Sequence, residues 1–237
     1  MDMTESEQLY RDVTGSEQLY GRQGFGLRMG FGERPALLIV DMQNDFVASE
    51  AITNAAPSAR RAIPHIRALR EVCRELGVPV FYSRGIVHPS RVDEGLWQAK
   101  SIGHRDGRVQ IDGTWGAEIC DELRPTPEEI VIRKHKPSVF FASDFEVYLR
   151  GYRVDTLIIT GSSTSGCVRA TVYDAFNREI RAVLPRECQV DRTSEVLEAN
   201  LFDMDAKYAD VMPVDEVVAQ LRRVVAARGP AVRATAG

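Results

Sequence analysis

Residues 158–171 read Ile158-Ile159-Thr160-Gly161-Ser162-Ser163-Thr164-Ser165-Gly166-Cys167-Val168-Arg169-Ala170-Thr171. The apolar run at 157–160 predicts a buried strand, and the turn of small residues after it leads into a helix predicted over 167–178. A strand that is joined to a helix by a short turn is half of a βαβ unit, so this stretch decides the fold class. Helix N-termini favour anions, and we therefore expect a lowered pKa for the Cys167 thiol.

Apolar runs alternate with helical patterns along the rest of the chain. Runs of this kind are typical of strands that are buried on both faces of a parallel sheet. We predict strands at residues 36–40, 78–82, 130–132, 157–160 and 182–184, and helices at 57–76, 144–151, 167–178, 193–208 and 214–227. The expected fold is a doubly wound α/β fold: a mainly parallel sheet of about six strands with helices on both faces, in three layers.

The domain organisation follows from length and composition. A chain of 237 residues with 44% hydrophobic content suits one globular domain, expected at residues 33–230. An N-terminal arm, residues 1–32, holds the near-repeat Ser-Glu-Gln-Leu-Tyr at 6–10 and 16–20, and both a flexible tail and an arm packed on a neighbouring subunit fit it. A short tail, 231–237, follows. Residues 84–115 are polar and aperiodic, which predicts a long loop that forms a lid or a subunit contact.

The charge and the cysteine content limit the kinds of partner and of bound metal that we expect. The formal net charge is −4 and no block of Lys or Arg forms a face, so we expect a small-molecule substrate rather than nucleic acid or a membrane. The start of the chain is acidic and polar, unlike a signal peptide, and we expect a cytoplasmic protein. The four cysteines lack C-x-x-C spacing, which argues against disulfides and a zinc site: Cys73, Cys120, Cys167 and Cys188.

Three chemically active side chains come directly after predicted strands. Asp41 follows the first strand, Lys134 the third and Cys167 the fourth. Ligands of open parallel sheets bind at the carboxyl ends of the strands, so these side chains are expected to meet there. An Asp41–Lys134 salt bridge alone would satisfy two buried charges. A thiol beside them would in addition allow nucleophilic catalysis, in which the carboxylate takes the thiol proton and returns it to a leaving amine.

Three separated motifs, spanning most of residues 32–215, resemble the cysteine hydrolases of the isochorismatase-like superfamily. They are Pro35-Ala36-Leu37-Leu38-Ile39-Val40-Asp41-Met42-Gln43-Asn44-Asp45-Phe46, Ile132-Arg133-Lys134-His135-Lys136-Pro137-Ser138-Val139-Phe140, and the segment from Gly161 to Thr171. The resemblance implies that Asp41 is the base and that Cys167 is the nucleophile. It selects Lys134, not Lys136, as the lysine that stabilises charge.

The resemblance also implies the geometry of the nucleophile turn. A cis peptide bond is expected between Ser162 and Ser163, and the backbone N–H groups of Ser163 and Cys167 would form an oxyanion hole. Phe46 would line the substrate pocket. Of the two tryptophans that flank the long loop, Trp97 and Trp115, we favour Trp115 for the pocket, because it precedes the third strand.

Within the superfamily, the chain looks most like N-carbamoylsarcosine and maleamate amidohydrolases, and less like biuret hydrolases. This implies an enzyme that releases ammonia from a small carboxylate-bearing amide or ureide: N-carbamoylsarcosine or a related N-carbamoyl amino acid first, then maleamate, then biuret. Arg192 would grip the substrate carboxylate. An ion pair of Arg192 with Asp191 or Glu195 is the alternative.

The last expectations concern metal binding, the oligomeric state and alternative functions. Nicotinamidases of the superfamily carry a metal held by an aspartate and histidines, whereas His88 and His104 stand 16 residues apart here without a D-x-H motif, so we expect no metal and no cofactor. Relatives form tetramers, which implies a homo-oligomer, either dimer or tetramer. A degenerate member that binds a small acid and a redox-reactive thiol protein are the remaining alternatives.

Overall fold

Seven parallel strands form one central sheet in the computed structural model, which describes residues 20–48 and 55–228. Their order is β3-β2-β1-β4-β5-β7, with β6 paired to β4, and every pairing between these strands is parallel. The strands are β1 (Pro35–Val40), β2 (Val80–Gly85), β3 (Ile130–Lys134), β4 (Thr156–Ser162), β5 (Arg181–Pro185), β6 (Gln189–Val190) and β7 (Asp210–Met212). The predicted fold class is confirmed. The strands β6 and β7 were not predicted, because two or three residues are too few to show a pattern.

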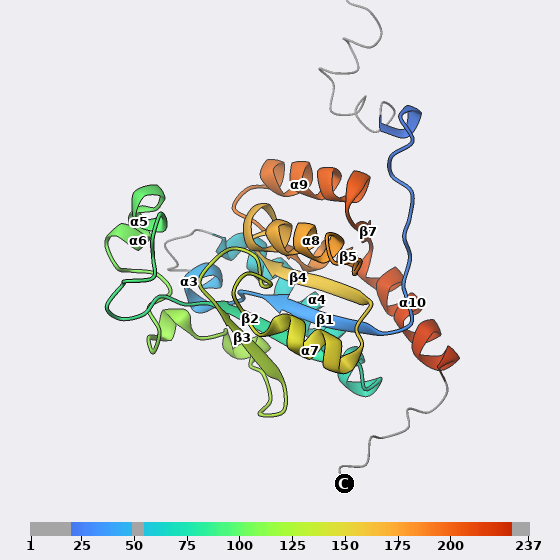
Figure 1. Ribbon diagram of the computed structural model, residues 1–237, viewed down its shortest axis with the longest axis horizontal. Helices are drawn as coiled ribbons and strands as arrows, with labels where there is room; N and C mark the ends of the chain where they lie inside the picture. Colours follow the sequence, from blue (N-terminus) through green and yellow to red (C-terminus); the bar gives the residue numbers. More distant parts are fainter. Residues whose placement is uncertain (1–19, 49–54, 229–237) are drawn as a thin grey trace, which may run out of the picture.

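Helices cover both faces of the sheet (Figure 1). The long helices α4 (Ala56–Glu75) and α10 (Val214–Ala227) pack on one face, and α7 (Phe145–Tyr152), α8 (Arg169–Phe176) and α9 (Ser194–Lys207) on the other. Shorter helices are α3 (Asn44–Val47), α5 (Trp97–Lys100), α6 (Ile102–Arg105), η1 (Trp115–Ala117), η2 (Asp121–Leu123), η3 (Thr164–Val168) and η4 (Arg186–Cys188). Within the described residues, no helix is both long and apolar enough to cross a membrane.

The core divides according to the alternation of side chains along each strand. In β1, Leu37 and Ile39 face α4 and α10, whereas Leu38 and Val40 face α7, α8 and α9. All four are buried, and burying a side chain of this size contributes about 1.5–3 kcal/mol. Because β1 is buried on both faces, its position is fixed, and so is the residue that follows it.

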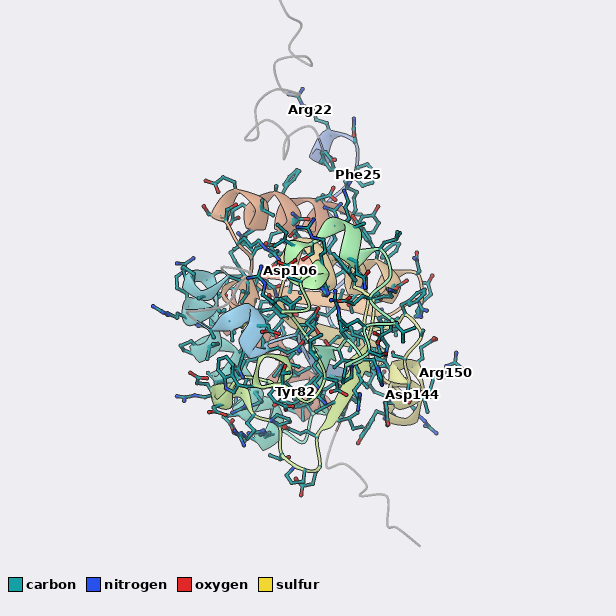
Figure 2. The ribbon with its side chains drawn as sticks, turned by 90° about the vertical axis from the view of Figure 1, so that its left-hand side faces the viewer. Arg22, Phe25, Tyr82, Asp106, Asp144 and Arg150 are labelled. Carbon is teal, nitrogen blue, oxygen red and sulfur yellow. The ribbon has the colours of Figure 1, made fainter. Side chains whose placement is uncertain are left out.

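The described part of the predicted arm lies against its own chain. The N–H of Gly26 donates to the carbonyl of Ala206 at 3.0 Å, and the N–H of Gly30 donates to the Asp210 carboxylate at 2.7 Å. In Figures 1 and 2 this segment extends past α9 at the edge of the molecule, and Figure 2 labels Arg22 and Phe25 there. Residues 1–19, which hold most of the near-repeat, and the tail at 231–237 lie outside the described residues.

The direction of the strand order reverses between β1 and β4, which is where doubly wound sheets bind ligands. Gly161 lets these two strands approach closely: its φ is +105°, and an added Cβ would lie 2.2 Å from the carbonyl oxygen of Val40. The helices α3, α5 and α6 gather at the carboxyl ends of the strands (Figure 1). Figure 2 looks at the molecule from that side, and Asp106, which follows α6, lies in the middle of the view.

Candidate active site

Asp41 sits immediately after β1 with its carboxylate fully buried. Its φ of +47° is unusual for a residue with a side chain, and such conformations are concentrated at functional sites. The Ser83 hydroxyl of β2 donates to Oδ1 at 2.7 Å, and Lys134 Nζ lies 2.7 Å from Oδ2. The neighbouring strands β2 and β3 thus supply both partners of the buried carboxylate.

Lys134 joins Asp41 to Cys167. Its Nζ lies 3.3 Å from the Cys167 Sγ and donates a further hydrogen bond to the carbonyl of Lys136 at 3.2 Å. The lysine ends β3, and its side chain is almost completely buried. The structure therefore brings together the three residues that the sequence pointed to, one from each of three strand ends.

In the cluster of Asp41, Lys134 and Cys167, the pKa of the thiol differs from our expectation. Burial raises the pKa of the Cys167 thiol to about 12, with Asp41 adding to the rise and Lys134 opposing it, so the predicted lowering is wrong. The expectation fails because burial outweighs any effect of a helix N-terminus; the regular helix α8 begins only at Arg169, and Cys167 lies before it in the π-helical turn η3. Burial would lower the pKa of Lys134, but Asp41 and Cys167 outweigh it and raise that pKa, which keeps the ammonium charged.

The turn that carries Cys167 is held in place by Asp191, the residue that follows β6. The peptide bond between Ser162 and Ser163 is cis, as the resemblance implied. The N–H of Ser165 donates to Oδ2 of the buried Asp191 at 2.7 Å, and the N–H of Arg192 donates to Oδ1 at 2.8 Å. Sequence reasoning missed Asp191 as a residue that positions this turn, because its hydrogen-bond partners are backbone groups that no side-chain pattern reveals.

A cavity of about 610 Å³ opens over Cys167 and Lys134. Residues predicted to contact the oxyanion or the substrate border it: Ser163, Phe46 and Arg192. The rest of the wall comes largely from the predicted long loop, which contains α5 and α6. Its contribution includes Trp97, the alternative to Trp115, together with Glu94 and His104, which the sequence did not place in the pocket.

Trp115 does not border this cavity, which corrects our preference for it. The Asn44 side chain donates to the Trp115 carbonyl at 2.8 Å and holds η1 against α3, while Trp115 as a whole is 65% exposed. Trp115 lines a second cavity, of about 460 Å³, together with Arg84 and Arg133. Trp97, the other tryptophan that we considered for the pocket, borders the catalytic cavity.

Arg192 keeps both of its possible roles. Its guanidinium lies 4.0 Å from the Asp191 carboxylate, half of the side chain is exposed, and the residue borders the cavity.

The histidines do not form a cluster: His88 contacts Ser90 at 2.7 Å, while His104 lies in the cavity wall. Across residues 20–48 and 55–228, no group of three or more His, Cys, Asp or Glu side chains is arranged to hold a metal ion.

Comparison with known proteins identifies the family. The isochorismatase domain family matches residues 35–216, so the chain belongs to the isochorismatase family. An N-carbamoylsarcosine amidase from an Arthrobacter species is 36% identical over 86% of this chain and 77% of its own length. A maleamate amidohydrolase from Pseudomonas putida is 35% identical over 84% of this chain and 92% of its own.

A solved structure agrees with these relatives. The crystal structure of an N-carbamoylsarcosine amidase from Thermoplasma acidophilum matches with a TM-score of 0.65 and 28% identity, covering 77% of this chain and 97% of the other. The family and its named relatives make this chain an enzyme of the amidohydrolase class.

Proposed function

We propose that this enzyme hydrolyses the terminal C–N bond of a small amide or ureide that carries a carboxylate, with N-carbamoylsarcosine or a related N-carbamoyl amino acid as substrate. The observation that carries the proposal is the contact of one ammonium, Lys134, with both the Asp41 carboxylate and the Cys167 thiol. A salt bridge alone would not need a thiol at 3.3 Å inside a cavity. The named relatives act on substrates of this type.

The first half of the reaction forms an acyl-enzyme. Because the thiol of Cys167 is protonated at neutral pH, Asp41 takes its proton as the sulfur attacks the carbonyl carbon. A C–S bond forms, and the carbonyl electron pair moves to the oxygen, where the backbone N–H groups of Ser163 and Cys167 stabilise the negative charge. Asp41 then gives the proton to the terminal nitrogen, the C–N bond breaks, and ammonia leaves.

The second half regenerates the thiol. A water molecule loses a proton to Asp41 and attacks the thioester or thiocarbamate carbon. The C–S bond breaks, the proton passes to the sulfur, and the acid product leaves. Lys134 stays charged throughout, so it stabilises both the ionised Asp41 and the transient thiolate.

The cavity favours an anionic substrate. Lys100, Lys136 and Arg192 all border it, and Arg192 is the one placed beside the nucleophile turn through its neighbour Asp191. A guanidinium can bind a carboxylate through two parallel hydrogen bonds. Maleamate, which also carries a carboxylate, is the second candidate, and biuret, which carries none, is the third.

Ammonia release distinguishes these candidates. The purified enzyme is offered N-carbamoylsarcosine, maleamate, biuret and nicotinamide side by side, with Cys167→Ala as the blank. We expect turnover of a carboxylate-bearing substrate and none by the variant. Release from biuret or nicotinamide alone would contradict the role of Arg192, and release from none of the four would favour a degenerate small-acid-binding member.

We also propose that the chain forms a homo-oligomer. Large apolar side chains stand exposed on the long loop and beside it, including Leu96 at 84% and Trp115 at 65%. Light scattering of the purified protein tests this, and a monomer at micromolar concentration would contradict it.

A further inference from the structure

Gln110 brings a side-chain amide to the wall of the catalytic cavity. The residue is half-buried in the long loop, and it borders the cavity beside Gly85. Its backbone is fixed: the N–H donates to Asp45 Oδ2 at 2.6 Å, and the carbonyl accepts from the Val87 N–H at 2.7 Å. The side-chain amide, in contrast, makes no hydrogen bond to any other residue that the structure describes. An amide that is fixed at its base and has unused hydrogen-bonding groups is suited to binding a polar ligand.

Gly85 places this amide on the catalytic face of the sheet. A Cβ atom added to Gly85 would lie 1.9 Å from Gln110 Nε2, so the amide occupies the space that a side chain at position 85 would fill. Side chains alternate along a strand, and position 85 therefore has the same orientation as Ser83, whose hydroxyl contacts Asp41. Gly85 is also paired with Lys134 across β2 and β3. The Gln110 amide therefore lies on the face of the sheet to which Ser83 and Lys134 point.

The order of the strands sets the direction in which a substrate extends. Asp41 follows β1 and Cys167 follows β4, whereas Arg192 comes shortly after β6, which pairs with β4 on the side away from β1. Gln110 lies over the end of β2, on the opposite side of β1. A substrate is expected to bind with its carboxylate at Arg192 and its carbonyl carbon at Cys167. Its terminal nitrogen then extends over β1, towards Asp41 and Gln110.

The amide oxygen is the atom of Gln110 that remains for the substrate. Nε2 lies against Gly85, whereas Oε1 is 3.6 Å from the same added Cβ position and thus further from the strand. The terminal nitrogen of an amide or ureide carries two hydrogens, and its lone pair must face Asp41, which protonates it. A hydrogen is then available for Oε1. Because the nitrogen gains positive charge as it is protonated, this hydrogen bond strengthens in the transition state.

We propose that Gln110 Oε1 accepts a hydrogen bond from the terminal NH₂ group of the substrate, holds the leaving nitrogen beside Asp41, and so favours amides and ureides that release ammonia. The inference rests on the proposed function, which it deepens, because it names the group that recognises the leaving nitrogen. Gln110 makes and breaks no covalent bond; it determines specificity. An ester at the same carbonyl has no hydrogen to donate at this position, so the contact contributes nothing to its turnover.

Two variants remove the contact in different ways. Gln110→Ala deletes the amide. Gly85→Ala keeps Gln110 but displaces its amide, because the three atoms nearest to the new Cβ all belong to the Gln110 side chain. The φ of Gly85 lies outside the left-handed region, so alanine fits the backbone there. Gln220→Ala is the matched control: Gln220 is in α10, donates to Glu216 at 3.0 Å and does not border the catalytic cavity.

The test measures kcat and KM for two pairs of probes: N-carbamoylsarcosine with N-(methoxycarbonyl)sarcosine, and maleamate with monomethyl maleate. In the second member of each pair, a methoxy group replaces the terminal NH₂. On the nitrogen-bearing probe that the wild type hydrolyses, Gln110→Ala should lower kcat/KM by about ten- to a hundredfold, mainly through kcat. On the corresponding ester the loss should be less than about threefold, and Gln220→Ala should change neither.

A double-mutant cycle tests the position of the amide. Gly85→Ala alone should lower kcat/KM on the nitrogen-bearing probe by at least about tenfold. Added to Gln110→Ala, it should cost less than about a further threefold, because no amide is left to displace. Fully additive losses would show that Gly85→Ala acts without the amide, and would overturn the placement on which the inference rests.

The outcomes separate the inference from the proposed function. An unchanged kcat/KM of Gln110→Ala on the nitrogen-bearing probe would overturn the inference and leave the amidohydrolase function intact. Equal losses on this probe and its ester would also overturn it, because they would indicate a general disturbance of the site. Turnover of none of the probes by the wild type would contradict the proposed function, and the inference with it.

Discussion

The two sides of the catalytic cavity are built in different ways. The floor, Asp41, Lys134 and Cys167, stands at the carboxyl ends of strands, and its members contact one another at 2.7 and 3.3 Å. The roof, residues 84–115, contains only short helices and places Glu94, Trp97 and His104 over the floor. The floor is held by a sheet buried on both faces, whereas the roof is held mainly by hydrogen bonds among its own residues.

This difference separates chemistry from specificity. A change in the floor disturbs a buried charged cluster and should affect turnover and stability together. A change in the roof alters the shape and charge of the cavity without opening the core, and should mainly affect which substrate is accepted. The four predictions that follow test this separation, from the largest expected effect to the smallest.

Removal of the nucleophile should have the largest effect. Cys167→Ala is expected to lower kcat by at least about a thousandfold, because the remaining groups cannot form the acyl-enzyme. Ammonia release measures the loss. Cys73→Ala is the control: this thiol is buried in α4, away from the cavity, so its loss should lower stability and leave kcat unchanged. Substantial turnover by Cys167→Ala would contradict the assignment of Cys167 as the nucleophile.

Lys134→Met should reduce both activity and stability. It leaves Asp41 buried without its cation, which typically costs about 3–5 kcal/mol of unfolding free energy. Urea denaturation measures the cost. On the roof, Lys100→Met should change the unfolding free energy by less than about 0.5 kcal/mol, because the Lys100 side chain is exposed. Equal losses in the two variants would contradict the distinction between floor and roof.

Arg192→Ala should raise KM for carboxylate-bearing substrates by about ten- to a hundredfold and change kcat less, since a charge-assisted hydrogen bond is lost in ground state and transition state alike. Steady-state kinetics measure both parameters. Arg186→Ala serves as the comparison, because Arg186 is exposed and pairs with Glu198 outside the cavity. An unchanged KM in Arg192→Ala would favour the alternative ion pair with Asp191.

The pH dependence of alkylation tests the state of the thiol. Because the pKa of Cys167 is raised to about 12, little thiolate exists at pH 7, and the reaction with iodoacetamide should accelerate steadily from pH 7 to pH 9. Labelling at Cys167, followed by peptide mass spectrometry, measures the rate. A rate that is already constant above pH 7 would mean that the resting enzyme holds a thiolate.

The sequence predicted the floor and the fold better than the roof, for physical reasons. Asp41, Lys134 and Cys167 follow buried apolar runs, and the geometry of a parallel sheet brings such positions together. Ser83 and Asp191 hold the floor through contacts with distant parts of the chain, which a pattern of local residues does not reveal. Glu94 and Trp97 lie in an aperiodic segment, where nothing in the sequence states which way a side chain points.

Local reasoning also failed where packing determines the outcome. The expected low thiol pKa followed from a helix start, but burial and the neighbouring Asp41 reverse the direction. Trp115 was preferred over Trp97 from its place in the chain, but the Asn44 hydrogen bond holds its helix away from the cavity. In both cases the deciding contact comes from another segment.

Rapid quenching of the wild-type enzyme with N-carbamoylglycine, followed by intact-protein and peptide mass spectrometry, tests the central claim most directly. We predict a transient increase in mass equal to that of N-carbamoylglycine less one ammonia, located on Cys167 and absent from Cys167→Ala. Full turnover with no adduct on Cys167 at any quench time, in acid that preserves thiocarbamates, would contradict covalent catalysis by this floor.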